Sequence, residues 1–161
     1  MRYAMTVIAH EFTKTFLLFI IFSLLGYFKL FLFSFCVLIF IRPFSGGLHF
    51  KSPSVCFLVS LIFFLMTVII LPHIFIPNFF ISLIIGGISI LLIFLNSPKP
   101  SPLRPIINPK RRQNFKYVST VFSLILLIIL LTFIHNSTFL ACGIYTLFLQ
   151  SLQLLGKGDV L

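Results

Sequence analysis

The feature that most constrains this chain is a series of long apolar segments that carry almost no charge. Hydrophobic residues make up 60% of the sequence and charged residues 9%, whereas roughly a quarter of the residues in a soluble domain are charged. About 20 apolar residues in a helix span the hydrocarbon core of a bilayer. The 161 residues therefore predict an all-α integral membrane protein with four to six membrane segments, built as one polytopic domain over residues 1–161.

Four segments are long and apolar enough to be predicted as transmembrane helices. They cover residues 53–71, 79–95, 118–134 and 139–155. The turns inside each pair, residues 72–78 and 135–138, contain no Lys or Arg, which is typical of turns on the outer side of a cell membrane. Residues 1–15 mix polar and apolar groups and are predicted to form an interfacial N-terminal helix, with no cleavage site of a removable signal peptide after the first apolar run.

The apolar run 16–41 allows two arrangements, because Gly26 and Lys29 interrupt it near its middle. It is either one long tilted span or a hairpin of two short helices. If Arg2 and Arg42 lie on the same side of the membrane, the chain between them must cross an even number of times or not at all. This condition favours a hairpin or a re-entrant pair, so that one or two short N-terminal segments join the four spans.

The charge balance is strongly positive, with twelve Lys and Arg residues against two acidic residues and a formal net charge of +10. Basic residues in the loops of a membrane protein orient the chain and contact anionic lipid headgroups, so we expect lipid contacts and no nucleic-acid partner. Residues 96–117 are predicted to be a proline-rich cytoplasmic loop, and counting crossings from it places residues 42–56 on the cytoplasmic side as well. The basic residues of the loop expected to contact substrate or lipid are Lys110, Arg111, Arg112 and Lys116.

The scarcity of acidic residues limits the chemistry that this chain can perform. Only Glu11 and Asp159 carry carboxylates, so paired-carboxylate hydrolysis and two-metal sites are hard to form. Any chemistry must therefore come from Cys, His, Ser or backbone groups. Among the three cysteines, Cys36 and Cys142 lie in apolar runs and are expected to be small buried hydrophobic residues.

Cys56 is expected in the first turn of a helix. Ser52 is a favourable N-cap residue, and Pro53 is well tolerated at the first helical position. Unpaired backbone N–H groups and the positive end of the helix dipole stabilise a thiolate there, and the nearby charges of Arg42 and Lys51 act in the same direction. The same N–H groups are suited to hold the oxyanion of a tetrahedral intermediate.

His49 is the candidate base for this thiol. A chain reversal at Gly46 and Gly47 would bring the imidazole back over the first turn and toward the sulfur of Cys56. An imidazole within hydrogen-bond reach of a thiol is the minimum for nucleophilic catalysis by cysteine. The same spacing also fits an interfacial histidine and a buried thiol, and the residues alone leave both interpretations open.

The other histidines lie in different loops from His49, so a zinc site lacks ligands and neither a metal nor a cofactor is expected. A third catalytic residue is not indicated by the spacing. An orienting partner for the imidazole would have to be a backbone carbonyl or a neutral side chain. The neutral candidates are Ser45, Ser52, Asn96 and Gln113.

The run Arg42, Gly46-Gly47, His49 and Cys56 resembles the signature of the accessory gene regulator B family. Members of this family are bacterial membrane cysteine endopeptidases that trim the precursors of cyclic autoinducing peptides for quorum sensing. The resemblance covers residues 26–116 in motif, including the basic proline-rich segment, and extends to the end of the chain in layout. The segment before the motif is shorter than the family pattern.

The resemblance implies that Cys56 is the nucleophile and His49 its base, with Arg42 and Gly47 supporting the site. Gly46 and Ser52 complete the supporting set as the chain reversal and the helix start. In the family the cysteine attacks a peptide bond near the C-terminus of the precursor, and an internal thiol or hydroxyl resolves the acyl-enzyme by forming a ring. The implied partner is a short peptide precursor with an amphipathic leader and an acidic C-terminal tail, which suits a basic enzyme.

Two other functions stay open at this point. One is a small non-enzymatic transport or export subunit that moves a peptide or a lipid, although the spans contain no buried acidic residue and no inverted repeat. The other is a structural membrane protein whose loop only contacts lipid. The sequence also leaves open whether the chain forms a homodimer.

Overall fold

The protein is all-α, and its computed structural model describes residues 2–47, 52–98 and 108–156. The described part forms six helices, of which the third contains a short π-helical stretch. They are α1 (Arg2–Leu24), α2 (Phe28–Ser45), the helix Pro53–Ile74 made of α3 (Pro53–Leu65), η1 (Met66–Ile70) and α4 (Leu71–Ile74), α5 (Phe79–Asn96), α6 (Pro109–Phe133) and α7 (Ser137–Gln153). The all-helical fold predicted from the apolar segments is confirmed.

The apolar run 16–41 is a hairpin, which settles the choice left open by the sequence. Helices α1 and α2 meet at a turn in which Gly26 has a φ angle of +79°, a conformation that favours glycine. The rings of Phe22 and Phe31 stack across the hairpin with their centroids 4.6 Å apart. Both helices are longer than half of the run because α1 already begins at Arg2 and α2 continues to Ser45.

The protein is a multi-pass membrane protein in which four helices are long and apolar enough to cross a bilayer. These are α2, Pro53–Ile74, α5 and α6. Three of the four predicted spans are among these helices, α2 is added, and the predicted span 139–155 is not among them. The corresponding helix, α7, has 17 residues, and residues 141–147 are buried without interruption, so every face of this stretch is covered by protein.

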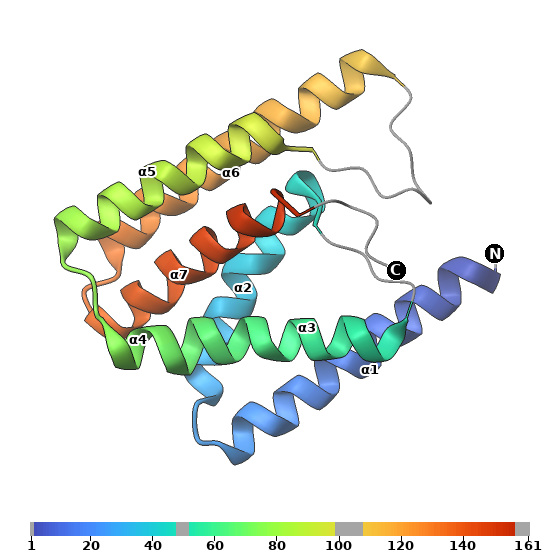
Figure 1. The fold of residues 1–161 in the computed structure, drawn as a ribbon, viewed down its shortest axis with the longest axis horizontal. Helices are drawn as coiled ribbons and strands as arrows, with labels where there is room; N and C mark the ends of the chain where they lie inside the picture. Colours follow the sequence, from blue (N-terminus) through green and yellow to red (C-terminus); the bar gives the residue numbers. More distant parts are fainter. Residues whose placement is uncertain (1, 48–51, 99–107, 157–161) are drawn as a thin grey trace.

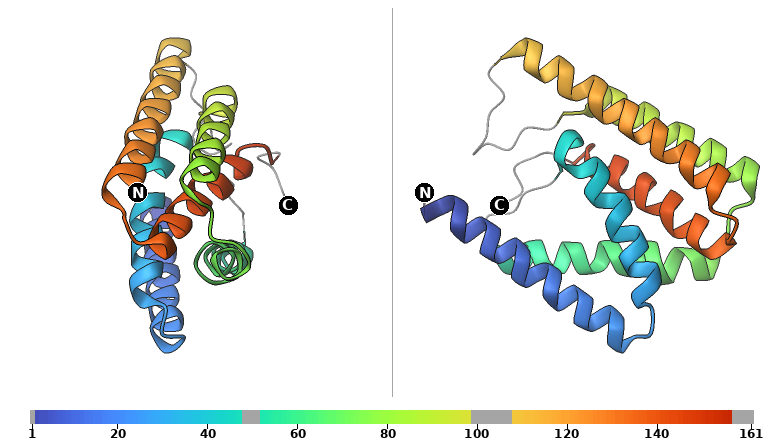
Figure 2. Two further views of the ribbon diagram at one scale, coloured as in Figure 1. Left: turned by 90° about the vertical axis from the view of Figure 1, so that its left-hand side faces the viewer. Right: turned by 180° about the vertical axis from the view of Figure 1, so that it is seen from behind.

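Helices α2 and α7 lie at the centre of the bundle, with the other helices on two sides (Figures 1 and 2). On one side α5 and α6 run next to each other, and their core with α2 and α7 includes Ile93, Leu127 and Ile144. On the other side α1 and the helix Pro53–Ile74 pack against α2 around a second core that includes Phe31 and Phe64. Helix α2 therefore connects two separate cores.

Small residues allow α5 and α6 to approach closely. Ser82, Gly86 and Ser89 are buried along one face of α5. A Cβ atom on Gly86 would lie 2.3 Å from Cδ1 of Leu127 on α6, so this position has no room for a side chain. Close backbone approach at small residues is a general means of packing helices in membranes, where lipid is as apolar as the helix surface.

The basic residues Lys110, Arg111, Arg112 and Lys116 lie in the first turns of α6 and not in a loop, which corrects the predicted loop 96–117. The amide of Lys110 donates to the side-chain oxygen of Asn108 at 3.0 Å, and Pro109 occupies the first turn. An Asn cap followed by proline starts a helix, so the last proline of the segment opens α6 instead of breaking it.

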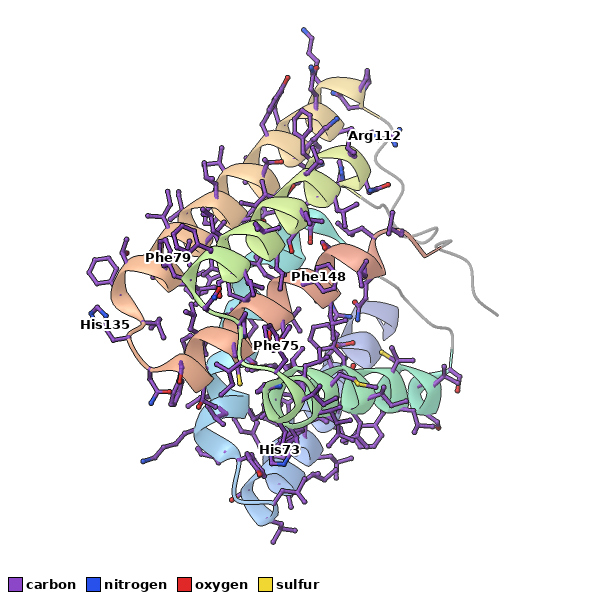
Figure 3. All side chains as sticks on the ribbon, turned by 60° about the vertical axis from the view of Figure 1, so that its left-hand side comes forward. His73, Phe75, Phe79, Arg112, His135 and Phe148 are labelled. Carbon is purple, nitrogen blue, oxygen red and sulfur yellow. The ribbon has the colours of Figure 1, made fainter. Side chains whose placement is uncertain are left out.

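The helix ends gather at two opposite sides of the molecule. Toward the right of Figure 1 lie the start of α1, the end of α2, the start of α3, the end of α5, the start of α6 and the end of α7. The turns after α1, α4 and α6 lie toward the left. Arg112 and His135, near the two ends of α6, are accordingly far apart (Figure 3). The sidedness agrees with the predicted topology, whereas the cytoplasmic location of the basic side stays a prediction.

Candidate active site

Cys56 lies in the first turn of α3, as the sequence predicts. Ser52 occupies the N-cap with an extended backbone (φ −86°, ψ 124°), Pro53 follows in the first turn, and the Cys56 N–H donates to the Ser52 carbonyl at 3.1 Å. The Ser52 side chain makes no capping hydrogen bond, so the helix start depends on the backbone and the proline. The Cys56 thiol is half-buried.

The start of α3 limits which backbone donors can serve the predicted oxyanion. Pro53 has no N–H, and the Cys56 N–H is bonded to the Ser52 carbonyl, so neither position offers a free donor. The amides of Ser54 and Val55 remain the candidates in this turn, and both residues are exposed.

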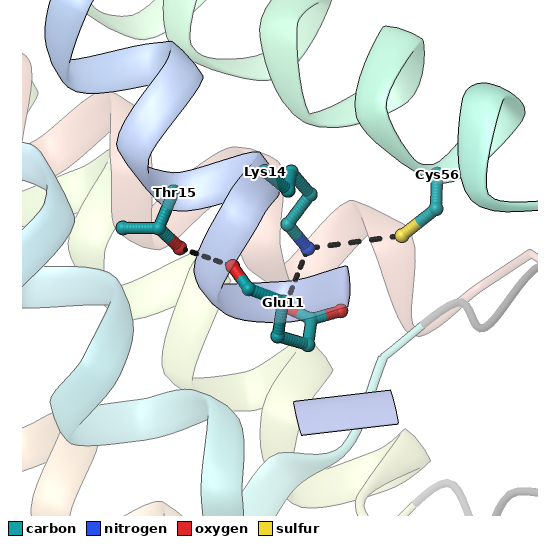
Figure 4. A network of polar contacts seen from close by, with 4 residues as sticks. All are labelled: Glu11, Lys14, Thr15 and Cys56. Atoms are coloured by element: carbon teal, nitrogen blue, oxygen red, sulfur yellow. Dashed lines mark hydrogen bonds and ion pairs between the residues drawn. The ribbon is translucent and has the colours of Figure 1, made fainter. Parts of the chain in front are cut away.

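A lysine from α1 contacts the sulfur of Cys56 (Figure 4). The Lys14 Nζ lies 3.7 Å from Sγ and 2.5 Å from Oε2 of Glu11, one turn earlier in the same helix. Lys14 is only 9% exposed, so the chain places a charged side chain inside the protein beside the thiol. Neither residue belongs to the site predicted from the sequence. The available signal was an acidic and a basic residue three positions apart on a helix that otherwise becomes apolar.

Arg42 and Cys56 line the same small pocket, although they lie on different helices. Gln153 from the end of α7 lines it too, so α2, α3 and α7 all contribute. The remaining lining residues are Leu38, Val59, Ser60, Phe63 and Phe64. Cys56 therefore lies at a pocket with a mostly apolar lining that Arg42 shares, which brings together two of the residues predicted from the motif.

Gly46 and Gly47 end α2 next to this pocket. Gly46 has φ +78° and ψ −161°, a backbone conformation that is essentially confined to glycine, and its N–H donates to the Arg42 carbonyl at 3.0 Å. Gly47 is buried, and a Cβ there would lie 3.7 Å from Nε of Arg42. The backbone conformation requires glycine at position 46, whereas a Cβ at position 47 would make ordinary van der Waals contacts.

Gln150 of α7 holds the end of α2 in place. Its Nε2 donates to the Gly46 carbonyl at 2.9 Å and to Oγ of Ser45 at 3.2 Å. The side chain is fully buried, and its Oε1 has no hydrogen-bond partner within the described residues. Sequence reasoning missed this residue, for which the signal was a glutamine inside an apolar segment.

His49 and Lys51 lie outside the described residues, so the expected contact between His49 and Cys56 stays a prediction. Cys142 is buried as expected. Cys36 is exposed on α2, which contradicts the prediction that it is buried. Both faces of a membrane helix are apolar, so an apolar run does not indicate which face turns inward. Among the residues that the structure describes, no three His, Cys, Asp or Glu side chains are grouped to hold a metal ion.

Fold and site together define a multi-pass membrane protein with a half-buried thiol at a helix start, beside an ammonium group and in a pocket that an arginine also lines. The family model described as accessory gene regulator B matches residues 1–154, which is nearly the whole chain and includes α1. The chain therefore belongs to the accessory gene regulator B family, as the motif suggested. Proteins of this family process peptide precursors and are generally cysteine endopeptidases.

Individual relatives agree with this assignment. The chain is 29% identical to an AgrB-like protein of Clostridium beijerinckii over 96% of this chain and 75% of the relative. It is 31% identical to AgrB-like protein 1 of Clostridium perfringens over 97% of this chain and 83% of the relative. The accessory gene regulator protein B of Staphylococcus carnosus is 31% identical over 60% of this chain and 49% of its own length. No solved structure matches the chain significantly.

Proposed function

We propose that this protein is a membrane cysteine endopeptidase that cleaves the C-terminal part of a quorum-sensing peptide precursor through an acyl-enzyme on Cys56. The observation that carries the proposal is the environment of the thiol. Cys56 is half-buried in the first turn of α3, its sulfur accepts from an ammonium group, and it faces a pocket shared with Arg42. Family membership supports a peptide precursor as the substrate.

The proposed reaction has two steps. His49 takes the proton of the Cys56 thiol, the thiolate attacks the carbonyl carbon of the peptide bond, and the resulting oxyanion accepts hydrogen bonds from amides at the start of α3. His49 then gives its proton to the departing amine, so the C–N bond breaks and a thioester remains on Cys56. In the second step His49 takes the proton of a thiol or hydroxyl within the peptide, which attacks the thioester, closes a ring and releases the Cys56 thiolate.

The charge distribution of the protein supports two partners, a peptide with an acidic tail and anionic membrane lipids. Lys110, Arg111 and Arg112 are exposed at the start of α6, on the same side of the molecule as the end of α2 and the start of α3. Positive groups on one face attract a negatively charged segment and raise the rate at which it associates with the site. The proposed location is the cell membrane, with this basic side and Cys56 toward the cytoplasm.

The alternative function is an export subunit that moves a peptide without cutting it. Such a protein has no use for a nucleophile, so it would transport the precursor unchanged when the thiol is removed. The geometry around Cys56 favours the peptidase, because an ammonium beside a half-buried thiol suits nucleophilic catalysis and is not needed for transport of a peptide.

The proposal predicts that membranes carrying the wild type cleave a co-expressed precursor and that Cys56→Ser membranes do not. His49→Ala should lower the cleavage rate by about 10²-fold or more, because general acid–base catalysis contributes on this scale. Cleavage is measured by mass spectrometry of the peptide products, and insertion is checked by the amount of protein in the membrane fraction.

Two other thiols serve as matched controls. Cys36→Ser and Cys142→Ser make the same exchange at sites away from the pocket, and both variants should keep cleaving the precursor. Normal cleavage by Cys56→Ser would exclude the mechanism. Export of an uncut precursor by that variant would favour the transport function instead.

A further inference from the structure

The ion pair of Lys14 with Glu11 does not by itself explain why the ammonium of Lys14 is buried. It lies on α1, 42 residues before Cys56, and it is held inside the protein at 9% exposure. Burying a charged group is costly unless it is paired, and the pairing here is divided between the carboxylate of Glu11 and the sulfur of Cys56. A cation needed only to bind Glu11 would be equally satisfied at the surface, where half of the Glu11 side chain is exposed.

The geometry lets one ammonium serve both partners. An ammonium has three N–H donors, of which one is directed to Oε2 at 2.5 Å and another to Sγ at 3.7 Å (Figure 4). A thiolate accepts such a bond far better than a neutral thiol, because the interaction is then one between opposite charges. The ammonium is therefore placed to pair with the sulfur when it is a thiolate, which is the nucleophilic form.

Other helices also bring polar or charged residues to the pocket that Cys56 lines. From α2, Arg42 lines the same pocket as Cys56, and from α7 the neutral Gln153 does so. His49 and Lys51 fall outside the described residues. In the described part of the chain, Lys14 is the charged group with a hydrogen bond to Sγ, while Arg42 shares only the pocket.

We propose that Lys14 is a catalytic residue that pairs with the Cys56 thiolate, and that Glu11 positions its ammonium. The proposal rests on the function proposed above and extends the active site to α1. During attack the sulfur loses its negative charge as the C–S bond forms, and the ammonium then keeps the carboxylate as its partner. When the ring closes, the thiolate leaves the carbonyl carbon and pairs with Lys14 again.

The test measures the alkylation rate of Cys56 by iodoacetamide against pH, in protein in which Cys36 and Cys142 are replaced by serine. Lys14→Met should slow alkylation at neutral pH by about tenfold and displace the rate profile toward higher pH, because the thiolate loses its counter-ion. Lys14→Arg keeps the positive charge and should retain most of the rate. Glu11→Gln should have a smaller effect than Lys14→Met.

The matched control is Lys29→Met, which removes an exposed lysine of α2 and should leave the profile unchanged. Size-exclusion profiles in detergent show whether each variant is folded, and Lys14→Arg covers the case in which Lys14→Met does not fold. Identical profiles for the wild type and a folded Lys14→Met, or a loss in Lys14→Arg equal to that in Lys14→Met, would overturn the proposal.

The alkylation assay needs no substrate, so it separates the two proposals. A Lys14-dependent profile in a protein that never cleaves the precursor would support the ion pair and refute the peptidase function. Cleavage that depends on Cys56, together with an alkylation profile that Lys14→Met leaves unchanged, would support the peptidase function and refute the ion pair.

Discussion

At the scale of single residues, Gln150 of α7 binds the end of α2, the helix that carries the motif. The motif ends α2 at Gly46, whose carbonyl lies 104 positions from Gln150 in sequence and 2.9 Å from its Nε2. Because Gly46 precedes the segment with His49, this hydrogen bond fixes where that segment leaves α2. The site therefore depends on α7, which contains no residue of the motif.

Replacing Gln150 by leucine keeps the size of the side chain but removes its donors. The carbonyl of Gly46 and the hydroxyl of Ser45 then lose a buried partner, so we expect a loss of about 1–3 kcal/mol in unfolding free energy and slower precursor cleavage. Thermal unfolding in detergent and the cleavage assay measure the two effects. Gln113→Leu, on an exposed position of α6, is the control for stability. Equal stability of the two variants would contradict the role given to Gln150.

At the scale of helices, the pairing of α5 with α6 depends on two adjacent glycines with different surroundings. A Cβ on Gly86 would meet three carbon atoms of Leu127 within 3.2 Å, whereas one on Gly87 would meet no atom within 4 Å. Gly87 is exposed and faces outward, where lipid tolerates an apolar side chain.

The two positions allow one substitution to be tested in two environments. Gly86→Leu should destabilise the protein by about 1–3 kcal/mol, because the added side chain forces α5 and α6 apart. Gly87→Leu should stay near the wild type. The midpoint of heat-induced loss of the monodisperse peak in detergent reports both effects, and a Gly87→Leu variant as unstable as Gly86→Leu would show that the packing is not the cause.

Helix boundaries show how far local sequence signals reach. The signal that places a helix start at Ser52 and Pro53 also operates at Asn108 and Pro109, where the proline content suggested a loop instead. Cap residues act through bonds to amides within the next three residues, so this information is local and can be read from sequence. The predicted loop 96–117 extends too far because its five prolines were all read as helix breakers, whereas the last of them, Pro109, follows a cap residue and begins α6.

At the scale of the whole molecule, the arrangement of helix ends makes the topology testable. All ends near the proposed site lie on one side, and the basic start of α6 lies there too. Positive residues remain on the cytoplasmic side of membrane proteins, so the turns after α4 and α6 should face outward.

Single cysteines in a protein without its three native thiols test this orientation. Cysteine at position 135, beyond α6, should react with an impermeant maleimide in intact cells, whereas cysteine at position 113 should react only after permeabilisation. Cysteine in place of the outward-facing Leu32 of α2 is the control and should resist the reagent in both conditions because lipid covers it. The opposite pattern at 113 and 135 would place Cys56 outside the cell.

What the sequence by itself determined is local or compositional. Apolar runs of about 20 residues require a membrane helix whatever surrounds them, and the Ser-Pro step places Cys56 in a first turn because proline suits the first helical position through its own ring. Tertiary structure alone decided which helices are central, which cysteine faces outward, and which polar groups converge. In a membrane both faces of a helix are apolar, so periodicity does not indicate the inward face. A polar residue in an apolar segment can be noticed, but its sequence does not identify a partner that lies 42 or 104 residues away. Lys14 and Gln150 join the site only because α1 and α7 pack where they do.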